Sequence, residues 1–302
     1  MAILQPRDKT LLSQLSRYGV LSTKQIGATS FQGIAHTTLM RRLRKLEEAD
    51  LILRLAGLPD AMSGWCLTTQ GASAIGANEP HRYSNQNTLL HEVTLSQVRM
   101  ALETVGMGEN WTSETELRKR FVFRPEMRQQ HQVVPDGIFV ADSKDGVGVA
   151  AVEVELNAKA HARYQRIFTE YADKDSIRWI WYLVPEPGIG NTVLKLWCKT
   201  RKEETSPKLL VSLLKEVLRN PSDALVYFEG KAHFKLSEFF KTKQPALGSL
   251  ENAPTAVQGV SKQDVVELSR ATEKKIETKS EDRSAPGKNG DMPSAVDPSP
   301  PT

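Results

Sequence analysis

Apolar residues recur with helical spacing through the first part of the chain. Three leucines share one face of a predicted helix over residues 8–18, and Gly19 ends that helix. Residues 22–25, Ser-Thr-Lys-Gln, have the sequence of a capping box, so a second helix is expected to run from there to about residue 28. The chain therefore opens with two short helices.

A third predicted helix is both amphipathic and basic. Leu39, Leu43 and Leu46 follow spacings of four and three residues, so they pack inward while the polar side chains between them turn outward. The candidate DNA-binding residues on this helix are Thr37, Thr38, Arg41, Arg42 and Lys45. Basic side chains suit phosphates and guanine edges, and threonine hydroxyls suit phosphates or either type of base pair. The alternative is a solvated basic face on a module that contacts protein.

Two short apolar runs, residues 51–55 and 64–68, flank a loop rich in Gly, Pro, Asp and Ser. This is the pattern of a two-stranded wing. Three helices and a wing predict a winged helix-turn-helix domain over residues 1–80, with its third helix in the major groove of double-stranded DNA. Charge supports this, because residues 1–56 hold nine Lys or Arg against four Asp or Glu, whereas the whole chain has a net charge of only +4.

After residue 85 the pattern changes to helices mixed with strands. The predicted elements are a helix over residues 87–104, a strand that holds Trp111 and Glu114, a hairpin of residues 136–141 and 147–156, a helix over 158–171, a central strand over 177–184, a helix over 206–218 and a strand over 224–229. With the hairpin counted as two strands, the first six elements have the order αβββαβ, which predicts an α/β (α+β) domain over residues 85–240.

Three carboxylates occupy special positions in the predicted hairpin. Asp136 follows a proline at the mouth of the first strand, and the alternation of the second strand sends Glu153 and Glu155 to the face opposite its valines. Like charges on one strand face repel, so a shared cation would explain the arrangement. Carboxylates without Cys or a His pair select Mg²⁺ or Mn²⁺. In the alternative interpretation, Asp136 caps a turn and both glutamates lie on a solvated sheet face.

Four other side chains near the hairpin are candidates for chemistry. His91 is suited to orient a scissile phosphate, and the alternative is a partly buried polar residue on a helix. Glu114 would extend the metal shell, and the alternative is an ordinary strand carboxylate. Tyr164 and Tyr171 lie seven residues apart on the helix over 158–171, on one side of it, where core packing is the expected role.

The sequence Pro135-Asp136, then Glu153-x-Glu155 and a helix, resembles the core of the PD-(D/E)xK nucleases, in which a hairpin carries the metal carboxylates. The chain departs from that pattern at Glu155, where the family has a lysine, and the nearest lysine is Lys159 at the start of the predicted helix. The resemblance implies a restriction-endonuclease-like fold for the second domain. With His91 and Glu114 included, the candidate catalytic residues are Lys159, Glu153 and His91, and the candidate metal ligands are Asp136, Glu153, Glu155 and Glu114.

A longer stretch, roughly residues 8–185, resembles the replication-relaxation family. The motifs that carry this resemblance are Tyr18-Gly-Val-Leu-Ser, Arg41-Arg-Leu-Arg-Lys-Leu-Glu-Glu-Ala-Asp-Leu, Leu67-Thr-Thr-Gln-Gly, His91-Glu-Val, Trp111-x-Ser-Glu114, Pro135-Asp-Gly and Val152-Glu-Val-Glu-Leu. Members of that family join a winged helix to such a core and are similar to the MobC-type relaxases that nick plasmid transfer origins. The resemblance implies a relaxase-like protein that binds double-stranded DNA at a plasmid transfer origin and nicks one strand with Mg²⁺ or Mn²⁺. Other mobilisation or coupling proteins are the further partners of such an activity.

A different class of function is a non-catalytic DNA-binding regulator of plasmid replication or transcription. The missing lysine at Glu155 favours the regulator, whereas three retained carboxylates favour the nuclease. A restriction or repair endonuclease that cuts both strands is a third hypothesis, because a fold does not fix a function.

The end of the 302-residue chain differs in composition from the rest. No aromatic residue follows Phe240, and Pro, Ser, Lys and Glu dominate, so residues 245–302 are predicted to form a disordered tail. Cys66 and Cys198 lack a metal-type spacing and are expected to be buried, reduced thiols. The sequence shows no leader and no apolar run of the roughly 18 residues that span a bilayer, so we expect a cytoplasmic protein without membrane contacts.

Overall fold

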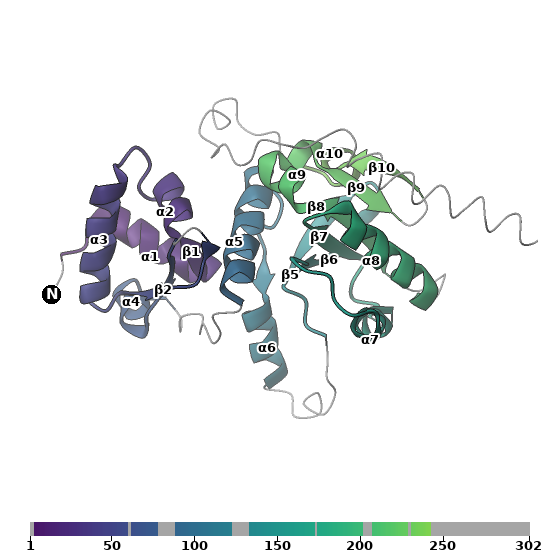
Figure 1. Cartoon of the computed structure of the whole chain (residues 1–302), viewed down its shortest axis with the longest axis horizontal. Coiled ribbons are helices and arrows are strands. Elements are labelled where there is room, and N and C mark those ends of the chain that lie inside the picture. Colours follow the sequence, from purple (N-terminus) through teal and green to yellow (C-terminus); the bar gives the residue numbers. More distant parts are fainter. Residues whose placement is uncertain are drawn as a thin grey trace, which may run out of the picture.

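The computed structural model describes residues 3–59, 62–77, 88–122, 133–172, 174–201, 207–228 and 231–242. The predicted tail over residues 245–302 lies outside these ranges. Figure 1 shows a small group of helices with a short sheet at one end of the molecule, a larger sheet with its helices at the other, and α5 between them. The elements are α1 (Pro6–Tyr18), β1 (Val20–Ser22), α2 (Thr23–Thr29), α3 (His36–Glu48), β2 (Ile52–Leu55), β3 (Gly64–Leu67), α4 (Thr69–Ala74), α5 (Leu89–Thr104), β4 (Thr112–Ser113), α6 (Glu114–Val122), β5 (Gly137–Ser143), β6 (Gly146–Val154), α7 (His161–Ala172), β7 (Trp179–Val184), α8 (Pro187–Thr200), β8 (Lys208–Leu213), α9 (Leu214–Arg219), η4 (Pro221–Asp223), β9 (Leu225–Phe228), β10 (Lys231–Lys235) and α10 (Leu236–Phe239).

The N-terminal module consists of α1–α4 and an antiparallel sheet of order β1-β3-β2. The three predicted helices are confirmed, and Gly19 follows α1 with a φ of 84°, a conformation that favours glycine. Both bonds of the predicted capping box at the start of α2 are present, between Ser22 and Gln25. The two runs predicted as strands are confirmed as β2 and β3, which pair antiparallel. Strand β1 was not predicted, because three residues are too short to show an alternation.

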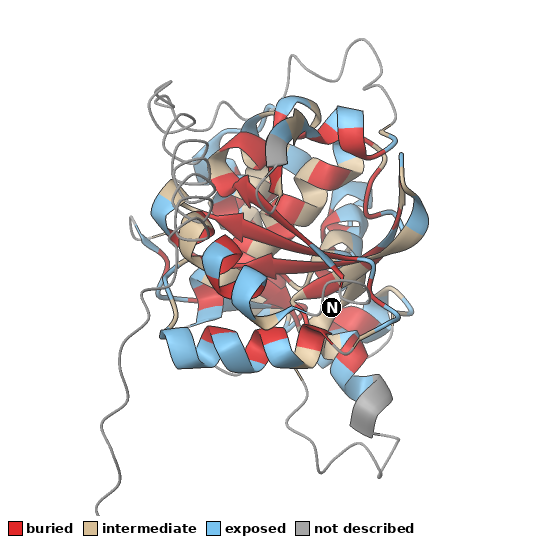
Figure 2. Cartoon of the chain, turned by 90° about the vertical axis from the view of Figure 1, so that its right-hand side faces the viewer, coloured by how far each residue is buried: buried red, intermediate tan, exposed pale blue. Residues whose placement is uncertain are grey.

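The larger sheet has seven strands in the order β10-β9-β8-β7-β6-β5-β4. Strand β7, predicted as central, is the fourth of these, and all six of its residues are buried. Strands β6, β7 and β8 are parallel, while β5 and β9 run antiparallel to their neighbours. One core lies under α5, α9 and α10 and the other under α7 and α8. Figure 2 shows the buried strands enclosed between helices whose outer faces are exposed, so this part of the molecule has three layers.

Strand β6 has the two faces that its alternation predicts. Val152 and Val154 belong to the core under α5, and Ala151 belongs to the core under α7. Glu153 accepts a hydrogen bond from Tyr171 of α7, so it points to the α7 side. The hairpin of β5 and β6 is therefore confirmed, together with the directions of its side chains.

Two predicted elements of the second half were wrong. The run predicted as a helix over residues 206–218 is strand β8 followed by α9, because β8 pairs with β7 on one side and with β9 on the other. The strand predicted around Glu114 has only two residues, and Glu114 begins α6. Ser113 and Glu116 form a capping box there, since Glu116 Oε2 accepts from the Ser113 N–H at 2.8 Å. The sequence Ser-Glu-Thr-Glu carried that signal.

Helix α5 packs against both sheets. Leu89 and Val93, near its start, lie in a small core with Val20, Leu55 and Cys66 of the N-terminal module. Farther along, α5 contributes Val98, Leu102 and its C-cap residue Val105 to the core of the large sheet.

Polar contacts join the end of α1 to α5. The Tyr18 hydroxyl donates to Glu103 at 2.5 Å, and the Ser96 hydroxyl donates to the Tyr18 carbonyl at 2.9 Å. Arg99 donates to the carbonyl of Arg17 at 2.6 Å. Burial raises the pKa of Tyr18 to about 12, and its bond to Glu103 raises it further in the same direction, so the hydroxyl keeps its proton. One helix thus holds the two modules together.

The expectation for the cysteines is confirmed only in part. Both thiols are free and Cys66 is buried, but Cys198 is exposed on α8. Among the helices that the structure describes, none has the length and apolar character required to cross a membrane.

Candidate functional site

Asp136 lies directly before β5 and is held by two hydrogen bonds to the same carboxylate oxygen. Its Oδ2 accepts from the backbone N–H of Val154 at 2.7 Å and from His91 Nε2 at 3.0 Å. The first bond joins the start of β5 to the end of β6, and the second joins the hairpin to α5. The carboxylate is therefore fixed at the mouth of the strand, as the sequence predicted.

Gly137 makes this placement possible. A Cβ atom at residue 137 would lie 2.1 Å from the ring of Trp111, which packs on the backbone at this point. Trp111 in turn stacks on Phe139, with ring centroids 6.0 Å apart. The residue after Asp136 must be glycine, because the indole occupies the space of any side chain.

Glu153 is buried in the layer between β6 and α7. Its side chain accepts a hydrogen bond from the Tyr171 hydroxyl, and the residue is only 8% exposed. Burial, followed by the nearby charge of Asp136, raises the pKa of Glu153 to about 8. Beside it on β7, Tyr182 buries a hydroxyl that has no hydrogen-bond partner among the described residues.

Glu155 is the first residue after β6 and is also buried, at 4% exposure. It forms an ion pair with Lys159. Burial raises the pKa of Glu155, while the bond to Lys159 acts in the opposite direction. Lys159 was predicted at the start of a helix, but this is wrong, because α7 begins only at His161. It lies in the preceding loop, where its N–H donates to the Tyr164 hydroxyl at 3.2 Å.

The buried glutamates rule out the alternative in which they lie on a solvated sheet face. Tyr164 and Tyr171 have their predicted place in the core, since both are fully buried. Their hydroxyls also bond to the loop and to Glu153, a polar role that the helical spacing alone does not predict.

His91 points from α5 to Asp136. Burial lowers the pKa of this imidazole, but its hydrogen bond to Asp136 and the charges of Asp136, Glu92 and Glu114 raise it, and the net value is about 9. The ring is therefore protonated near pH 7 and forms an ion pair with Asp136. In this arrangement it is bound to a carboxylate of the hairpin.

Glu114 lies at the start of α6, close to the hairpin. Its backbone N–H donates to the Asp136 carbonyl at 3.1 Å, but its carboxylate forms an ion pair with Arg118 at 2.5 Å. Glu114 therefore lies at the start of a helix and not on a strand. Its place in a metal shell stays a prediction.

The three hairpin carboxylates act on one another, because the charge of Asp136 raises the pKa of both Glu153 and Glu155. Within the described ranges, however, no group of three or more His, Cys, Asp or Glu side chains is arranged to hold a metal ion. Each carboxylate is turned to a protein partner, which is His91, Tyr171 or Lys159. The structure thus brings the predicted residues to one place, and metal binding there stays a prediction.

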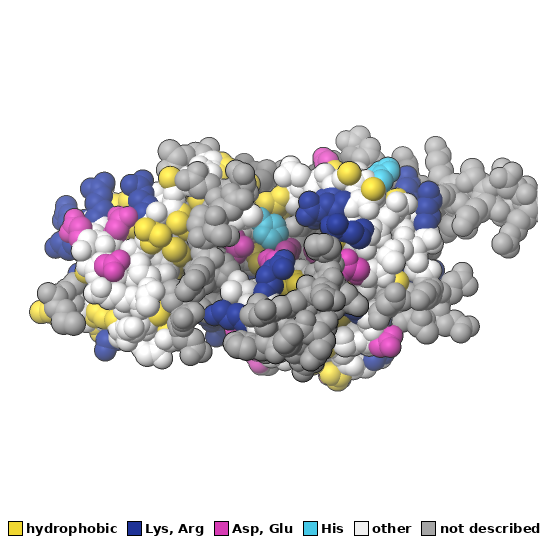
Figure 3. All heavy atoms as spheres, turned by 90° about the horizontal axis from the view of Figure 1, so that it is seen from below, with side chains coloured by type: hydrophobic (Ala, Val, Ile, Leu, Met, Phe, Trp, Pro, Cys, Tyr) yellow, Lys and Arg dark blue, Asp and Glu magenta, His cyan; other side chains and the backbone are white. Residues whose placement is uncertain are grey.

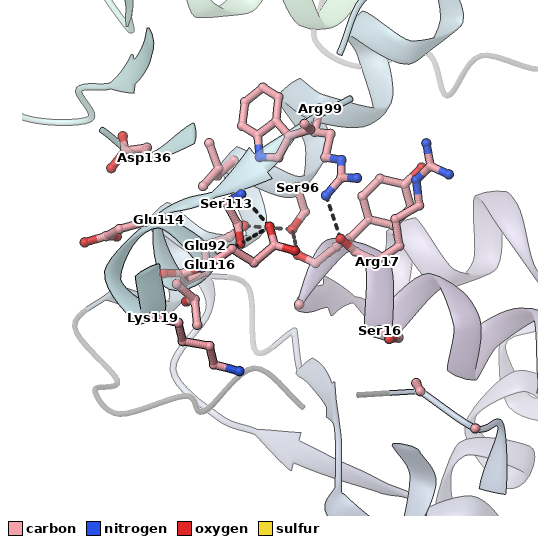
Figure 4. A pocket seen from close by; sticks show the side chains of 17 residues that line it. Ser16, Arg17, Glu92, Ser96, Arg99, Ser113, Glu114, Glu116, Lys119 and Asp136 are labelled. Carbon is pink, nitrogen blue, oxygen red and sulfur yellow. Dashed lines mark hydrogen bonds between the residues drawn. The ribbon is translucent and has the colours of Figure 1, made fainter. Parts of the chain in front are cut away.

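A cavity of about 530 Å³ lies beside Asp136, between the N-terminal module and α5 and α6. Figure 4 shows Asp136 and Glu114 on one side of this cavity and Arg17 and Arg99 on the other, with Lys119 of α6 at its edge. Charged side chains of both signs line the cavity, so it suits a charged or hydrated ligand better than an apolar one.

Helix α3 presents most of its candidate DNA-binding residues to solvent. Thr37, Thr38, Arg41 and Lys45 are exposed, and so is Arg44, which was not among the candidates. Figure 3 shows Lys and Arg side chains at the end of the molecule formed by the N-terminal module.

Arg42 of the same helix has a different role. It forms an ion pair with Asp8, whose side chain is fully buried, and it also donates to the carbonyl of Ile3 at 3.1 Å. Asp8 in turn accepts from the Gln5 N–H at 2.7 Å and caps α1. Arg42 therefore ties α3 to α1 and is committed to the fold, which the helical pattern alone did not indicate.

Comparison with known proteins agrees with the sequence motifs. No curated protein and no solved structure matches the chain. The model of one family, described as replication-relaxation, matches residues 12–176, which is more than half of the 302 residues. The matched segment includes α3 and the whole carboxylate hairpin. The chain therefore belongs to the replication-relaxation family.

Proposed function

We propose that this protein binds double-stranded DNA at a plasmid transfer origin and nicks one strand in a reaction that uses Mg²⁺ or Mn²⁺. Its family suggests the coarser role, in plasmid replication or mobilisation. The observation that carries the nicking activity is the burial of Glu153 and Glu155, only 8% and 4% exposed, within electrostatic range of Asp136. Buried carboxyl groups are costly for a fold once they ionise, and they are useful where a cation or substrate completes them.

DNA binding is assigned to the N-terminal module. Helices α1–α3 and the three-stranded sheet have the element order of a winged helix-turn-helix, in which the third helix enters the major groove. In this proposal Arg41, Arg44 and Lys45 of α3 contact phosphates or base edges, because they are exposed. Arg42 is excluded from this role by its ion pair with Asp8.

Strand cleavage is assigned to the hairpin of β5 and β6. The elements around it follow the order α5-β4-β5-β6-α7-β7, with α6 inserted between β4 and β5, and this order resembles that of a PD-(D/E)xK core. Three carboxylates fit a hard divalent cation, which would supply an activated water and stabilise the leaving oxygen. Glu153 must release its proton, and Lys159 must leave Glu155, before these oxygens are free to bind a cation. The ammonium group of Lys159, released in this way, would stabilise charge on the phosphate.

The tyrosines support water as the nucleophile. Tyr164 and Tyr171 are fully buried and their hydroxyls bond to the Lys159 N–H and to Glu153. A phenol that attacks phosphorus must reach the DNA backbone, and neither hydroxyl is exposed to do so.

The nuclease assignment is tested with supercoiled plasmids that do or do not carry a transfer region, incubated with purified protein and Mg²⁺ or Mn²⁺. Glu153→Gln should abolish nicking and leave DNA affinity unchanged, because the amide keeps the shape and removes the anion. Lys159→Ala should slow nicking more mildly. Glu186→Gln, an exposed change before α8, is the matched control. Nicking by Glu153→Gln at the wild-type rate would end the assignment.

DNA binding is tested separately. Arg41→Ala/Lys45→Ala should weaken binding and reduce the slope of log affinity against log salt by roughly 0.9 for each lost phosphate contact. The thermal unfolding midpoint should stay unchanged, since both side chains are exposed. An unchanged slope would show that this face of α3 contacts protein.

One observation favours a second candidate, a DNA-binding regulator without catalysis. Asp136 and Glu155 are ion-paired to His91 and Lys159, so the hairpin is neutralised from within the protein. Specific binding to a plasmid origin, with no nicking in either metal and no effect of either metal on stability, would select the regulator.

A further inference from the structure

Helix α7 presents a basic surface beside the carboxylate hairpin. Its buried side is apolar and aromatic, with Tyr164, Phe168 and Tyr171 in the core. Arg163 and Arg166, three residues apart, are exposed on its other side. The only acidic residue of the helix, Glu170, is committed to the backbone N–H of Val133. The exposed surface of α7 is therefore cationic.

These two arginines differ from most arginines in the described part of the chain. Arg42, Arg99 and Arg118 each form an ion pair with a carboxylate. The side chains of Arg163 and Arg166 are exposed and form no hydrogen bond or ion pair with any described residue. An arginine that makes no bond within its own fold keeps all its donors for a ligand with oxygen acceptors.

The position of α7 relates this surface to the hairpin. Arg163 and Glu170 lie seven residues apart, on the same side of the helix. Glu170 contacts Val133, three residues before Asp136, so this side of α7 faces the segment that carries the first carboxylate. Tyr164, next to Arg163, is bonded to the loop of Lys159. Figure 3 shows acidic side chains and a histidine in the middle of one face, with Lys and Arg side chains next to them.

We propose that Arg163 and Arg166 form a second DNA-phosphate contact, which holds the backbone of the duplex at the carboxylate hairpin. This proposal rests on the DNA-binding function proposed above and extends it from α3 to the other module. The hairpin is neutralised by its own protein partners and offers a phosphodiester no net attraction, whereas two guanidinium groups on the helix beside it attract the phosphate charge. A guanidinium group can also bind two oxygens of one phosphate, which fixes the position of that phosphate on the helix. Contact by this surface does not depend on sequence, because it involves only the backbone.

The test measures binding of a fluorescein-labelled duplex of random sequence by anisotropy over a range of salt concentrations. Arg163→Ala/Arg166→Ala should weaken binding and reduce the log-log salt slope by roughly 1.8, about 0.9 for each phosphate. Arg163→Glu/Arg166→Glu should weaken it further, and Arg163→Lys/Arg166→Lys should keep the slope. Thermal melting of each variant verifies that the exposed substitutions leave the fold intact.

The control is Lys195→Ala/Lys199→Ala on α8, which removes the same charge from exposed positions. Strands β6, β7 and β8 are parallel, so α8 begins at the end of the sheet that carries the glutamates and returns to the opposite end. Lys199 lies in its last turn, so this pair should leave the slope unchanged. If Arg41→Ala/Lys45→Ala lowers the slope and the α7 variant does not, the second contact is refuted and DNA binding by α3 stands. If the wild-type protein binds neither this duplex nor one that carries the transfer region, both proposals fail together.

Discussion

The pH dependence of folding should report directly on Glu153. Its pKa rises from 4.5 in the unfolded chain to about 8 in the fold, chiefly because the carboxylate is buried. A group whose pKa is raised on folding stabilises the native state at low pH, and that stability is lost as pH rises through the folded value. A shift of this size corresponds to roughly 5 kcal/mol in total, of which roughly 3 kcal/mol falls between about pH 5.5 and pH 8.5.

Glu153→Gln removes this titration and keeps an oxygen that accepts the Tyr171 hydroxyl. The variant should therefore gain stability relative to wild type as pH rises, by roughly 3 kcal/mol over that interval. Urea unfolding followed by tryptophan fluorescence, at both pH values and in a chelator, measures the difference. Glu186→Gln, at an exposed position, should follow the wild-type curve.

Addition of Mg²⁺ at the higher pH extends the same experiment to the metal. A cation that binds the ionised hairpin should restore stability to wild type and have little effect on Glu153→Gln. Equal pH dependence in wild type and variant would refute the reasoning, since it would mean that Glu153 is already charged in the folded state at low pH.

Three further changes have defined outcomes. Arg42→Ala should lower stability by about 3–5 kcal/mol in urea unfolding, because it leaves buried Asp8 without its partner, and a loss below 1 kcal/mol would show that water replaces it. Gly137→Ala should lower the melting midpoint and abolish nicking, since its Cβ would meet Trp111 at 2.1 Å. Gly188→Ala, with open space around it, should do neither. A folded, active Gly137→Ala protein would contradict the packing argument. Deletion of the chain from residue 245 should leave the melting midpoint nearly unchanged, because that segment has no aromatic residue, and a drop of many degrees would contradict this.

The features that local pattern specifies were predicted correctly. The alternation of β6 placed Val152 and Glu153 on opposite faces, and the structure agrees because each face packs against a different layer of helices. The capping box at Ser22 fixed the start of α2, since both of its bonds lie within four residues.

The misses depend on contacts between distant segments. The position of Arg42 on its helix allows its side chain either to face solvent or to pair with Asp8. Only the packing of α1 against α3 decides between the two. Strand β8 has an apolar run that suits a helix or a strand, and pairing with β7 and β9 decides. Glu155 is buried because α7 covers the face of the sheet to which it points. The spacing of the carboxylates in the sequence does not predict that cover.

The shared helix α5 has a consequence for dividing this protein into fragments. A fragment that ends near residue 80 would expose Val20, Leu55 and Cys66, and one that begins after α5 would remove Val98 and Leu102 from the core of the large sheet. Neither piece has a closed apolar interior, so an N-terminal module can be exchanged between proteins only if α5 is transferred or redesigned with it. The distance from α3 to Asp136 is set by packed side chains and not by a linker. If the protein binds DNA as proposed, the DNA position that reaches the hairpin should therefore be fixed by the position that α3 binds.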